Sequence, residues 1–433
     1  MKLTYENALK LLETRKRKGR PQTPVVPPAR QNATSSNDTH TVRGTPSLVG
    51  MKEWLQTLGH SDNAVQTLNV LHIAGTKGKG STCAFTRSFL RTHGLRTGFP
   101  KRVGLYTSPH LQCIRERIQI DDQPITEDIF TRYFFEVWEG LASPSLEQAT
   151  ECIRQPRYLQ LLALLAFHTF IRENVDAAIF ETHHGGEYDA TNVIEKPVEA
   201  GPAQVLRSRA TEKMVPLTIV STNSSLPATN HVLSVPVQRL NCSLALELSK
   251  RFLQIKAPDH HLEPGDISAA IENFSRFEIV EDGLSQWFLD GAHNTLSLEH
   301  AAIWFSKNTT STVMKKDRVL IFSHCSEHRD GAALVECLAH TLAEYGALPD
   351  NVMFTTYEER EDGSMSISKY LNLFSIYSAL WKTLDPGATV SSELTIEGAI
   401  RRTNQISIDR GGVHVFVTGS LHLVGGALNL LRP

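Results

Sequence analysis

The sequence predicts a two-domain α/β protein in which parallel sheets are covered by helices. Short apolar runs typical of buried strands alternate with longer runs of helical periodicity along most of the chain. Such alternation favours parallel sheets with helices packed on their faces. The chain has 433 residues, which is long for one hydrophobic core and sufficient for two. We predict an N-terminal domain over residues 1–274 and a C-terminal domain over residues 275–433.

In the N-terminal domain, strands are predicted from short apolar runs, and helices from apolar residues spaced three and four apart. The predicted strands are Asn69–Ala74, Val103–Tyr106, Asp176–Phe180 and Pro216–Val220. The predicted helices are Ser81–Thr92, Thr126–Leu141, Arg157–Arg172 and Gln238–Phe252. Residues 20–46 are rich in Pro, Thr, Ser and Asn, which predicts a flexible insertion.

The same alternation resumes after the predicted boundary near Ser275. The predicted strands are Phe277–Glu281, Gln286–Leu289, Arg318–Ser323, Val352–Thr355 and His414–Val417. The predicted helices are Leu296–Phe305, Ala332–Glu344, Ile367–Trp381 and Leu421–Leu431. The C-terminal domain is therefore predicted to be a second, smaller α/β domain.

Composition excludes several classes of protein. Lys and Arg total 44 and Asp and Glu total 46, so the net charge of −2 gives no support for binding nucleic acid or a membrane surface. No apolar run approaches the roughly 18 residues of a membrane-spanning helix. The cysteines form no Cys-x-x-Cys pair, so neither a zinc site nor a disulfide framework is predicted. Residues 1–20 predict a helix rather than a signal peptide, so we expect a cytoplasmic protein, with a mitochondrial form left open.

The strongest motif is the glycine-rich sequence HIAGTKGKGST, from His72 to Thr82, between a predicted strand and a predicted helix. Small residues let backbone N–H groups turn toward a phosphate, and the helix N-terminus adds partial positive charge. Lys79 would neutralise terminal phosphates, and a hydroxyl of Ser81 or Thr82 would reach a phosphate or a metal ion. The spacing is tighter than the common Gly-x-x-x-x-Gly-Lys-Ser/Thr pattern, and a plain surface loop is the alternative. The motif predicts a P-loop, ATPase-like N-terminal domain, which would suit a kinase, an ATPase or a ligase.

Further motifs follow in a fixed order. They are GTKGKGST at 75–82, LYTSPHL at 105–111, RERI at 115–118, ETHHGGEYDATN at 181–192, LDGAHN at 289–294, SEHRD at 326–330 and VTGSLHLVGG at 417–426. Together they resemble the folylpolyglutamate synthase family of the Mur-ligase-like group, and its fungal branch most of all. The resemblance runs from about residue 50 to the end of the chain and also covers Tyr5–Leu12. It implies a P-loop domain followed by a smaller, Rossmann-like C-terminal domain.

The resemblance implies an ATP-dependent ligase of folate and one-carbon metabolism. ATP would phosphorylate the terminal γ-carboxylate of a tetrahydrofolate, and the amine of L-glutamate would attack the acyl phosphate to form a γ-linked amide. The implied cofactors are ATP and Mg²⁺, with a monovalent cation such as K⁺ as a further candidate, and the implied state is a monomer. Two alternatives stay open: a dihydrofolate synthase, which uses the same chemistry on a pteroate, and a non-catalytic nucleotide- or folate-binding relative.

By the resemblance, the nucleotide is bound by the loop and by three residues outside it. The loop residues are Gly75, Thr76, Lys77, Gly78, Lys79, Gly80, Ser81 and Thr82. The other three are Asn241, Arg276 at the domain hinge and Asp290 after a predicted strand. Lys79 is also a catalytic candidate, because phosphoryl transfer needs positive charge beside the moving group. His293 is the second catalytic candidate, either as a general base or as a residue with a structural or substrate-positioning role.

The implied Mg²⁺ ligands are Ser108 and Glu181. Both follow predicted strands, where α/β sheets bind ligands, and both offer the oxygen atoms that hard cations prefer. The alternatives are a structural Ser-Pro turn and a solvated glutamate. His183 and His184 suggest zinc by residue type, but adjacent imidazoles on a loop rarely bind one metal ion together, so zinc is not predicted.

Three departures from the family pattern bear on activity. Between Asn192 and Ala203 the chain lacks a block that the family uses for a third Mg²⁺ ligand, a histidine, and for a lysine near the transferred phosphate. The family's Trp-Pro-Gly before the hinge arginine is missing, and Pro236-Val237 replaces a Glu-His pair. The absent block is either a loss in the gene or an error in the gene model. Because phosphoryl transfer depends on placed positive charge, impaired catalysis is a further hypothesis.

Overall fold

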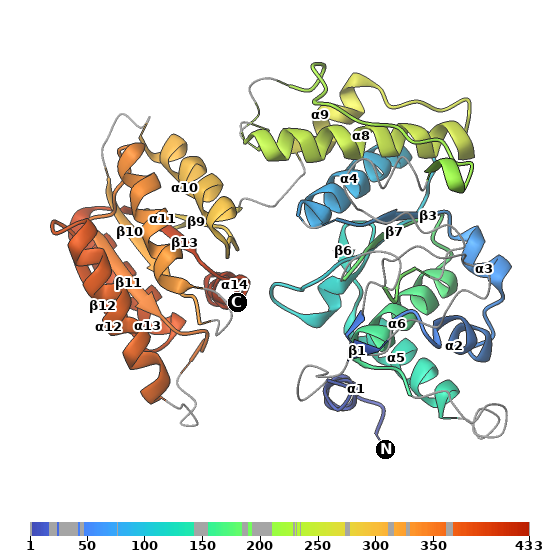
Figure 1. Ribbon diagram of the computed structural model, residues 1–433, viewed down its shortest axis with the longest axis horizontal. Helices are drawn as coiled ribbons and strands as arrows, with labels where there is room; N and C mark the ends of the chain where they lie inside the picture. The colour runs from blue at the N-terminus through green and yellow to red at the C-terminus, as the bar shows by residue number, and fades with distance from the viewer. Residues whose placement is uncertain are drawn as a thin grey trace. The chain divides into compact units, whose positions relative to one another are not determined.

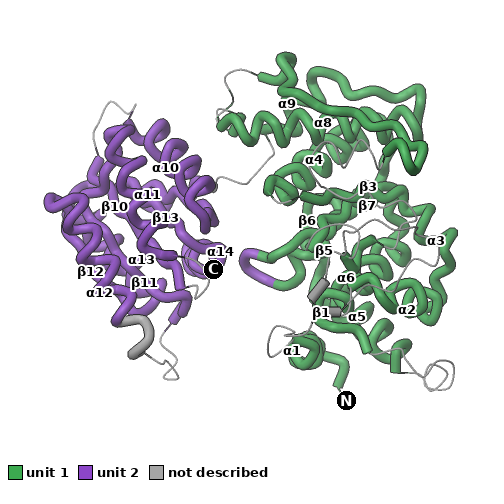
Figure 2. The backbone as a smooth tube through the Cα atoms, in the orientation of Figure 1, with its two compact units in different colours: residues 1–110, 114–274 green, residues 111–113, 275–433 purple. Residues whose placement is uncertain are grey.

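The chain forms two compact units, which Figure 2 distinguishes by colour. The first comprises residues 1–110 and 114–274, and the second comprises residues 111–113 and 275–433. The computed structural model describes residues 2–16, 24–25, 42–43, 47–75, 77–142, 155–183, 189–192, 210–227, 230, 232–233, 235–272, 278–310, 316–325, 330–360 and 367–432. No helix in these ranges is long and apolar enough to cross a membrane.

The described part of the first unit is organised around a five-stranded sheet. Its strands, in spatial order, are β3 (Val70–Ile73), β7 (Ala177–Glu181), β4 (Val103–Tyr106), β5 (Ile118–Ile120) and β6 (Gln123–Pro124). The first three are parallel, as predicted, whereas β5 and β6 run antiparallel to their neighbours. A short antiparallel pair, β1 (Pro24–Val25) and β2 (Val42–Arg43), lies apart from this sheet.

Helices cover both faces of the five-stranded sheet, with α4 and α8 on one side and α5 and α6 on the other (Figure 1). The helices of this unit are α1 (Tyr5–Glu13), α2 (Met51–Thr57), α3 (Asp62–Thr67), α4 (Lys79–Thr97), α5 (Glu127–Leu141), α6 (Tyr158–Arg172), α8 (Pro236–Lys256) and α9 (Pro264–Glu272). The side chains of β7 alternate between two cores: Ala177 and Ile179 pack with α4 and α8, whereas Ala178 and Phe180 pack with α5 and α6. A strand covered on both faces must be apolar along its length, and in β7 the only polar residue is the last one, Glu181.

Local signals set the ends of the helices. The side chain of Thr126 accepts a hydrogen bond from the N–H of Ile129 at 3.2 Å, which caps the start of α5 as the predicted helix start requires. At the other extreme, α4 ends at Gly98, whose φ of 84° lies in the left-handed region that glycine adopts without strain. The start of α5 was predicted from residue type, whereas the predicted helix Ser81–Thr92 ended five residues before the observed end of α4.

The prediction of a strand over Pro216–Val220 is wrong. Residues 215–223 form neither helix nor strand. The sheet ends at β3, and no described strand pairs with its outer side. Apolar side chains in and just before this segment are poorly covered: Ile219 is 68% exposed and Met214 is 91% exposed. An apolar run becomes a strand only where a neighbour satisfies its backbone hydrogen bonds.

The second unit contains a six-stranded sheet. Its spatial order is β12 (Thr389–Glu393), β11 (Asn351–Thr355), β10 (Asp317–Phe322), β13 (Val413–Thr418), β9 (Ser285–Leu289) and β8 (Glu278–Asp282). The strands are parallel except β8, which runs antiparallel to β9. Four of the five predicted strands match closely, and the fifth is β8, shifted by one residue. The partly exposed edge strand β12 was not predicted, because its residues are largely polar.

Helices also cover both faces of the second sheet. They are α10 (Thr295–Thr309), α11 (Gly331–Glu344), α12 (Ile367–Leu384), α13 (Ile396–Arg410) and α14 (Leu421–Leu431). On one face, α13 and α14 pack over Trp287 and the alternating valines of β13. On the other face, the rings of Phe305 and Phe416 stack with their centroids 4.7 Å apart. The predicted helices are confirmed, and α13, whose sequence is polar on average, was missed.

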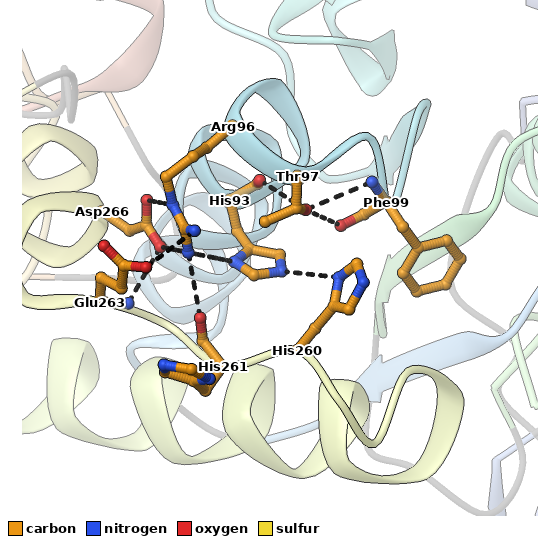
Figure 3. Close-up of polar contacts among 8 residues, drawn as sticks. All are labelled: His93, Arg96, Thr97, Phe99, His260, His261, Glu263 and Asp266. Carbon is orange, nitrogen blue, oxygen red and sulfur yellow. Dashed lines mark hydrogen bonds and ion pairs between the residues drawn. The ribbon is translucent and has the colours of Figure 1, made fainter.

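A buried polar cluster joins the end of α4 to α9, the last described helix of the first unit (Figure 3). The Asp266 carboxylate accepts hydrogen bonds from Nε and Nη2 of Arg96 at 2.9 and 2.8 Å. The fully buried His93 lies 3.4 Å from Asp266 through Nδ1 and 3.4 Å from His260 through Nε2. The Arg96 guanidinium holds the pKa of Asp266 down to about 2. The carboxylate is therefore charged at neutral pH and ties the two helices together.

Replacing Asp266 by Asn should lower the stability of the first unit by roughly 2 kcal/mol, the magnitude typical of hydrogen bonds to a charged group. The amide keeps the shape of the side chain but not the charge that pairs with Arg96. The midpoint of thermal unfolding measures the loss. Asp259→Asn is the matched control, because Asp259 is exposed in the segment between α8 and α9. Equal midpoints for the two variants would show that Asp266 does not stabilise the contact between α4 and α9.

Buried histidines should make the fold acid-sensitive. Burial lowers the pKa of His60 and of His414 to about 4, and also lowers the pKa values of His72, His93 and His168. Their usual pKa is 6.5, so between about pH 6.5 and pH 4 the unfolded chain binds more protons than the folded chain. The free energy of unfolding should therefore decrease as the pH is lowered through this range, by up to about 1.4 kcal/mol per pH unit for each such histidine.

Denaturant titrations at about pH 7 and about pH 5 measure this slope. His60→Gln should flatten it, because one depressed histidine is removed. His340→Gln should leave the slope unchanged, because His340 is exposed. A slope that is the same in His60→Gln as in the natural chain would show that His60 does not contribute.

Candidate nucleotide and metal site

Three strands bring candidate residues to one edge of the first sheet. β3, β7 and β4 are parallel, with Ile73 opposite Glu181 and Tyr106 opposite Phe180. The glycine-rich loop follows β3, Glu181 ends β7, and Ser108 lies two residues beyond β4. The carboxyl ends of parallel strands point the same way, so these groups lie at a common edge, where α/β sheets bind ligands.

The glycine-rich loop leads directly into α4. Gly78 precedes the first helical residue and has a φ of 81°, which favours glycine. Lys79, Gly80, Ser81 and Thr82 form the first turn of α4, in which the N–H of Thr82 donates to the carbonyl of Gly78 at 2.9 Å. The N–H groups that start a helix and the positive end of the helix dipole are the features that bind phosphate.

The charged and hydroxyl side chains of the loop fold back over its backbone. Lys79 Nζ donates a hydrogen bond to the carbonyl of Gly75 at 2.9 Å, and Thr82 Oγ1 donates to the carbonyl of Gly78 at 3.0 Å. Lys77 is exposed, whereas Lys79 is half-buried. A phosphate is a stronger acceptor for an ammonium than a carbonyl is. The Lys79 ammonium is thus held where a phosphate in the loop would attract it.

Asn241 of α8 packs directly on this loop. A Cβ atom at Gly78 would lie 2.5 Å from Oδ1 of Asn241, so a larger residue there would displace the Asn241 side chain. Asn241 Nδ2 also lies 3.4 Å from Oε1 of Gln238, three residues earlier on α8. The fold therefore places Asn241 beside the loop, and its contact with a nucleotide stays a prediction.

The two predicted metal ligands are linked by hydrogen bonds. The backbone N–H of Ser108 donates to Oε2 of Glu181 at 3.2 Å, and Thr107 Oγ1 donates to the same oxygen. Glu181 is only 5% exposed. Within the described residues, neither Oε1 of Glu181 nor the hydroxyl of Ser108 forms a hydrogen bond. Two oxygen atoms from neighbouring strand ends are therefore available at the site.

This donor set suits a hard divalent cation that the protein shares with a phosphate ligand. Mg²⁺ is usually held by one or two protein oxygens together with waters and substrate phosphates. The described residues contain no group of three or more His, Cys, Asp or Glu side chains that could hold a metal ion by themselves. Ser108 and Glu181 therefore fit a metal ion bound beside a nucleotide.

A buried hydrogen-bond network orders the chain after β7. His183 lies 2.6 Å from the hydroxyl of Tyr106 through Nε2 and 3.3 Å from Asp189 through Nδ1. Asp189 accepts hydrogen bonds from the N–H and the hydroxyl of Thr191, and that hydroxyl lies 2.7 Å from Nε2 of His72. Burial lowers the pKa of His72 and raises the pKa of Tyr106. Both ring nitrogens of His183 face protein groups, which does not favour its use as a metal ligand.

The candidates of the second unit lie at the end of β9. Asp290 accepts a hydrogen bond from the N–H of Ala292 at 2.9 Å, and its own N–H donates to the carbonyl of Val417 on β13 at 3.1 Å. His293 Nδ1 lies 2.9 Å from the carbonyl oxygen of Gly291. A carbonyl only accepts, so Nδ1 is the donor in this contact. The roles of Asp290 and His293 stay predictions.

The sequence analysis assigned no role to two residues of the site. Three residues that it considered lie outside the described ranges. No role was predicted for Thr107, although it directly follows an entirely buried strand, the signal that identified Glu181. Asp189 was also missed, although it lies within the motif at 181–192 and accepts hydrogen bonds from His183 and Thr191, six and two residues away. Thr76, Arg276 and His184 lie outside the described residues.

Comparisons with known proteins identify relatives over most of the chain. The chain is 34% identical to the folylpolyglutamate synthase of Neurospora crassa, over 99% of this chain and 92% of the relative. It is 32% identical to the folylpolyglutamate synthase of Saccharomyces cerevisiae, over 89% of this chain and 81% of the relative. The alignment with the Neurospora protein has 504 positions, more than the 433 residues of this chain, so several dozen residues of that relative have no counterpart here. No protein-family model matches the chain.

Solved structures show the same fold. The folylpolyglutamate synthase of Mycobacterium tuberculosis complexed with ADP and AMPPCP has a TM-score of 0.65 at 18% identity, covering 90% of this chain and 96% of that chain. The bifunctional folylpolyglutamate synthase/dihydrofolate synthase of Yersinia pestis complexed with AMPPNP and Mn ion has a TM-score of 0.65 at 19% identity. The match covers 99% of this chain and 98% of that chain. The predicted α/β fold class is thus confirmed. With curated relatives at 32% and 34% identity over most of their length, the chain belongs to the folylpolyglutamate synthase family.

Proposed function

We propose that this chain is an ATP-dependent ligase that adds L-glutamate to the γ-carboxylate of tetrahydrofolate and its polyglutamates. The observation that carries the proposal is the meeting of the glycine-rich loop, Ser108 and Glu181 at one sheet edge, in a member of the folylpolyglutamate synthase family. In this proposal, residues 1–274 are the ATP-binding domain and residues 275–433 the ligase domain. We also propose that the protein is cytoplasmic and monomeric.

The first unit is proposed to bind the nucleotide and the metal ion. Backbone N–H groups of the loop and the Lys79 ammonium would hold the phosphates, and Asn241 would contact the nucleotide beside Gly78. Ser108 and Glu181 would hold Mg²⁺, which when bound supplies charge neutralisation at the transferring phosphoryl group. The nucleotides and the Mn ion in the mycobacterial and Yersinia structures support this assignment by family likeness. A monovalent cation such as K⁺ stays a further candidate.

The proposed reaction makes a poor electrophile reactive. A carboxylate oxygen of the folate attacks the γ-phosphorus of ATP, so the P–O bond to ADP breaks and an acyl phosphate forms. The glutamate amine then attacks the acyl carbon, phosphate leaves with the C–O bonding pair, and the amine loses a proton. Charge on the transferring group is stabilised by preorganised donors such as Lys79. His293 is the proposed proton acceptor or positioning group, and Arg276 and Asp290 are proposed nucleotide contacts.

We also propose that this chain catalyses the reaction more slowly than relatives that keep the missing block. The longer alignment with the Neurospora relative supports an internal gap, and the family pattern places that gap between Asn192 and Ala203. That no described strand pairs with the outer side of β3 supports the loss of a sheet strand there. Sequencing the transcript across this region would separate a loss in the gene from an error in the gene model.

Two other functions are favoured by particular observations. The Yersinia neighbour is bifunctional, so dihydropteroate is the second substrate to test. The apparent gap favours a non-catalytic nucleotide- or folate-binding protein. Ligation of glutamate to dihydropteroate but not to tetrahydrofolate would support the first, and nucleotide binding without any ligation would support the second.

Lys79→Ala should weaken the binding of a non-hydrolysed ATP analogue by roughly 10–100-fold, because it removes a charged hydrogen-bond donor from the loop. Isothermal titration calorimetry measures the change. Lys250→Ala on α8 is the matched control, since Lys250 is exposed. Equal affinity in Lys79→Ala and in the natural chain would refute the loop as the phosphate site.

The natural chain should ligate glutamate at least about a hundredfold more slowly than the Neurospora relative, because a preorganised charge contact is worth about 10²–10³ in rate. Incorporation of labelled glutamate onto tetrahydrofolate, with ATP and Mg²⁺, measures the rate. Calorimetry with the ATP analogue on the same sample shows whether nucleotide binding is intact. A rate equal to that of the relative would show that the missing block is dispensable.

A further inference from the structure

We propose that Thr107 is a positioning residue for the metal site, which orients the Glu181 carboxylate for a divalent cation. This inference rests on the function proposed above, because it concerns the same cation. It adds a residue to which sequence reasoning gave no role. It is carried by the hydrogen bond from Thr107 Oγ1 to Glu181 Oε2.

The strand register creates this contact. β4 and β7 are parallel neighbours in which Tyr106 lies opposite Phe180. The next residue along each strand is therefore Thr107 on one and Glu181 on the other. Because pairing at the preceding position fixes the backbones, the hydroxyl and the carboxylate meet at the end of the ladder. The two residues are 74 positions apart in the sequence.

Both donors to Glu181 use the same oxygen. Thr107 Oγ1 and the backbone N–H of Ser108 donate to Oε2. This arrangement leaves Oε1 and the Ser108 hydroxyl without hydrogen bonds to other described residues. The carboxylate is therefore held with one oxygen committed to the protein and the other available to a cation.

Of these two donors, Thr107 is the one that a substitution can remove. The Ser108 donor is a backbone group, which stays whatever the side chain. Glu181 is 5% exposed, so water has little access to replace a lost hydroxyl. Hydrogen-bond partners of ligating carboxylates usually contribute about 10–100-fold to metal affinity. A rotated carboxylate would remove the one charged ligand of the two that are proposed.

The alternative is that the contact only fastens two strand ends. A structural role would weaken nucleotide binding equally with and without a metal ion. A positioning role would weaken only the part of the affinity that the metal ion adds. The ratio of the affinity for an ATP analogue in Mg²⁺ to its affinity in EDTA separates the two roles.

The experiment is calorimetry of the full chain with a non-hydrolysed ATP analogue, in Mg²⁺ and in EDTA. Thr107→Val keeps the shape and removes the hydroxyl, and should reduce the Mg²⁺-dependent gain in affinity by about 10–100-fold, with the EDTA affinity unchanged. Thr107→Ser keeps the hydroxyl and should restore the gain. Thr403→Val is the control for losing a buried hydroxyl elsewhere, since Thr403 is fully buried on α13 and bonds only within the second unit.

The outcomes separate failure of the inference from failure of the proposed site. If the natural chain shows no Mg²⁺-dependent gain, the proposed metal site itself is wrong. If the natural chain shows the gain and Thr107→Val keeps it in full, Thr107 does not position Glu181. A fall of equal size in Mg²⁺ and EDTA would assign Thr107 a structural role and overturn the inference.

Discussion

The parallel register of β3, β7 and β4 is the constraint on which the site depends. β7 lies between the other two strands and is buried along its whole length. Its alternate residues belong to two different cores. A slip of one residue would exchange these faces and move every side chain to the wrong layer. Packing on both faces therefore fixes where Glu181 lies relative to the glycine-rich loop and to Ser108.

Polar groups at this sheet edge are costly to bury, and the fold satisfies most of them internally. Glu181 receives two hydrogen bonds at one oxygen, and Asp189 receives hydrogen bonds from the backbone of His183 and from Thr191. Unsatisfied buried polar groups cost about 1–3 kcal/mol each. The network therefore links the ends of β4 and β7, while Oγ1 of Thr182 and Nδ1 of His183 are buried without a hydrogen-bond partner among the described residues.

The glycine-rich loop starts from the edge of its sheet. β3 is an edge strand, and no described strand pairs with its outer side. The loop leads from β3 into α4, and Asn241 of α8 packs on it at Gly78. The position of the loop therefore depends on helix packing on the sheet face as well as on the pairing of β3 with β7.

The sequence by itself determined what depends on neighbouring residues: the order of strands and helices, the turn that needs Gly78, and a carboxylate at the end of an apolar run. The family resemblance added roles for Ser108 and Asp290 that local pattern does not contain. Only the tertiary structure decided which residues meet. Thr107 reaches Glu181 across 74 positions, and Asn241 packs on Gly78 from a helix much later in the chain. Pro216–Val220 failed as a strand for the same reason, because strand formation requires a partner that no local pattern can supply.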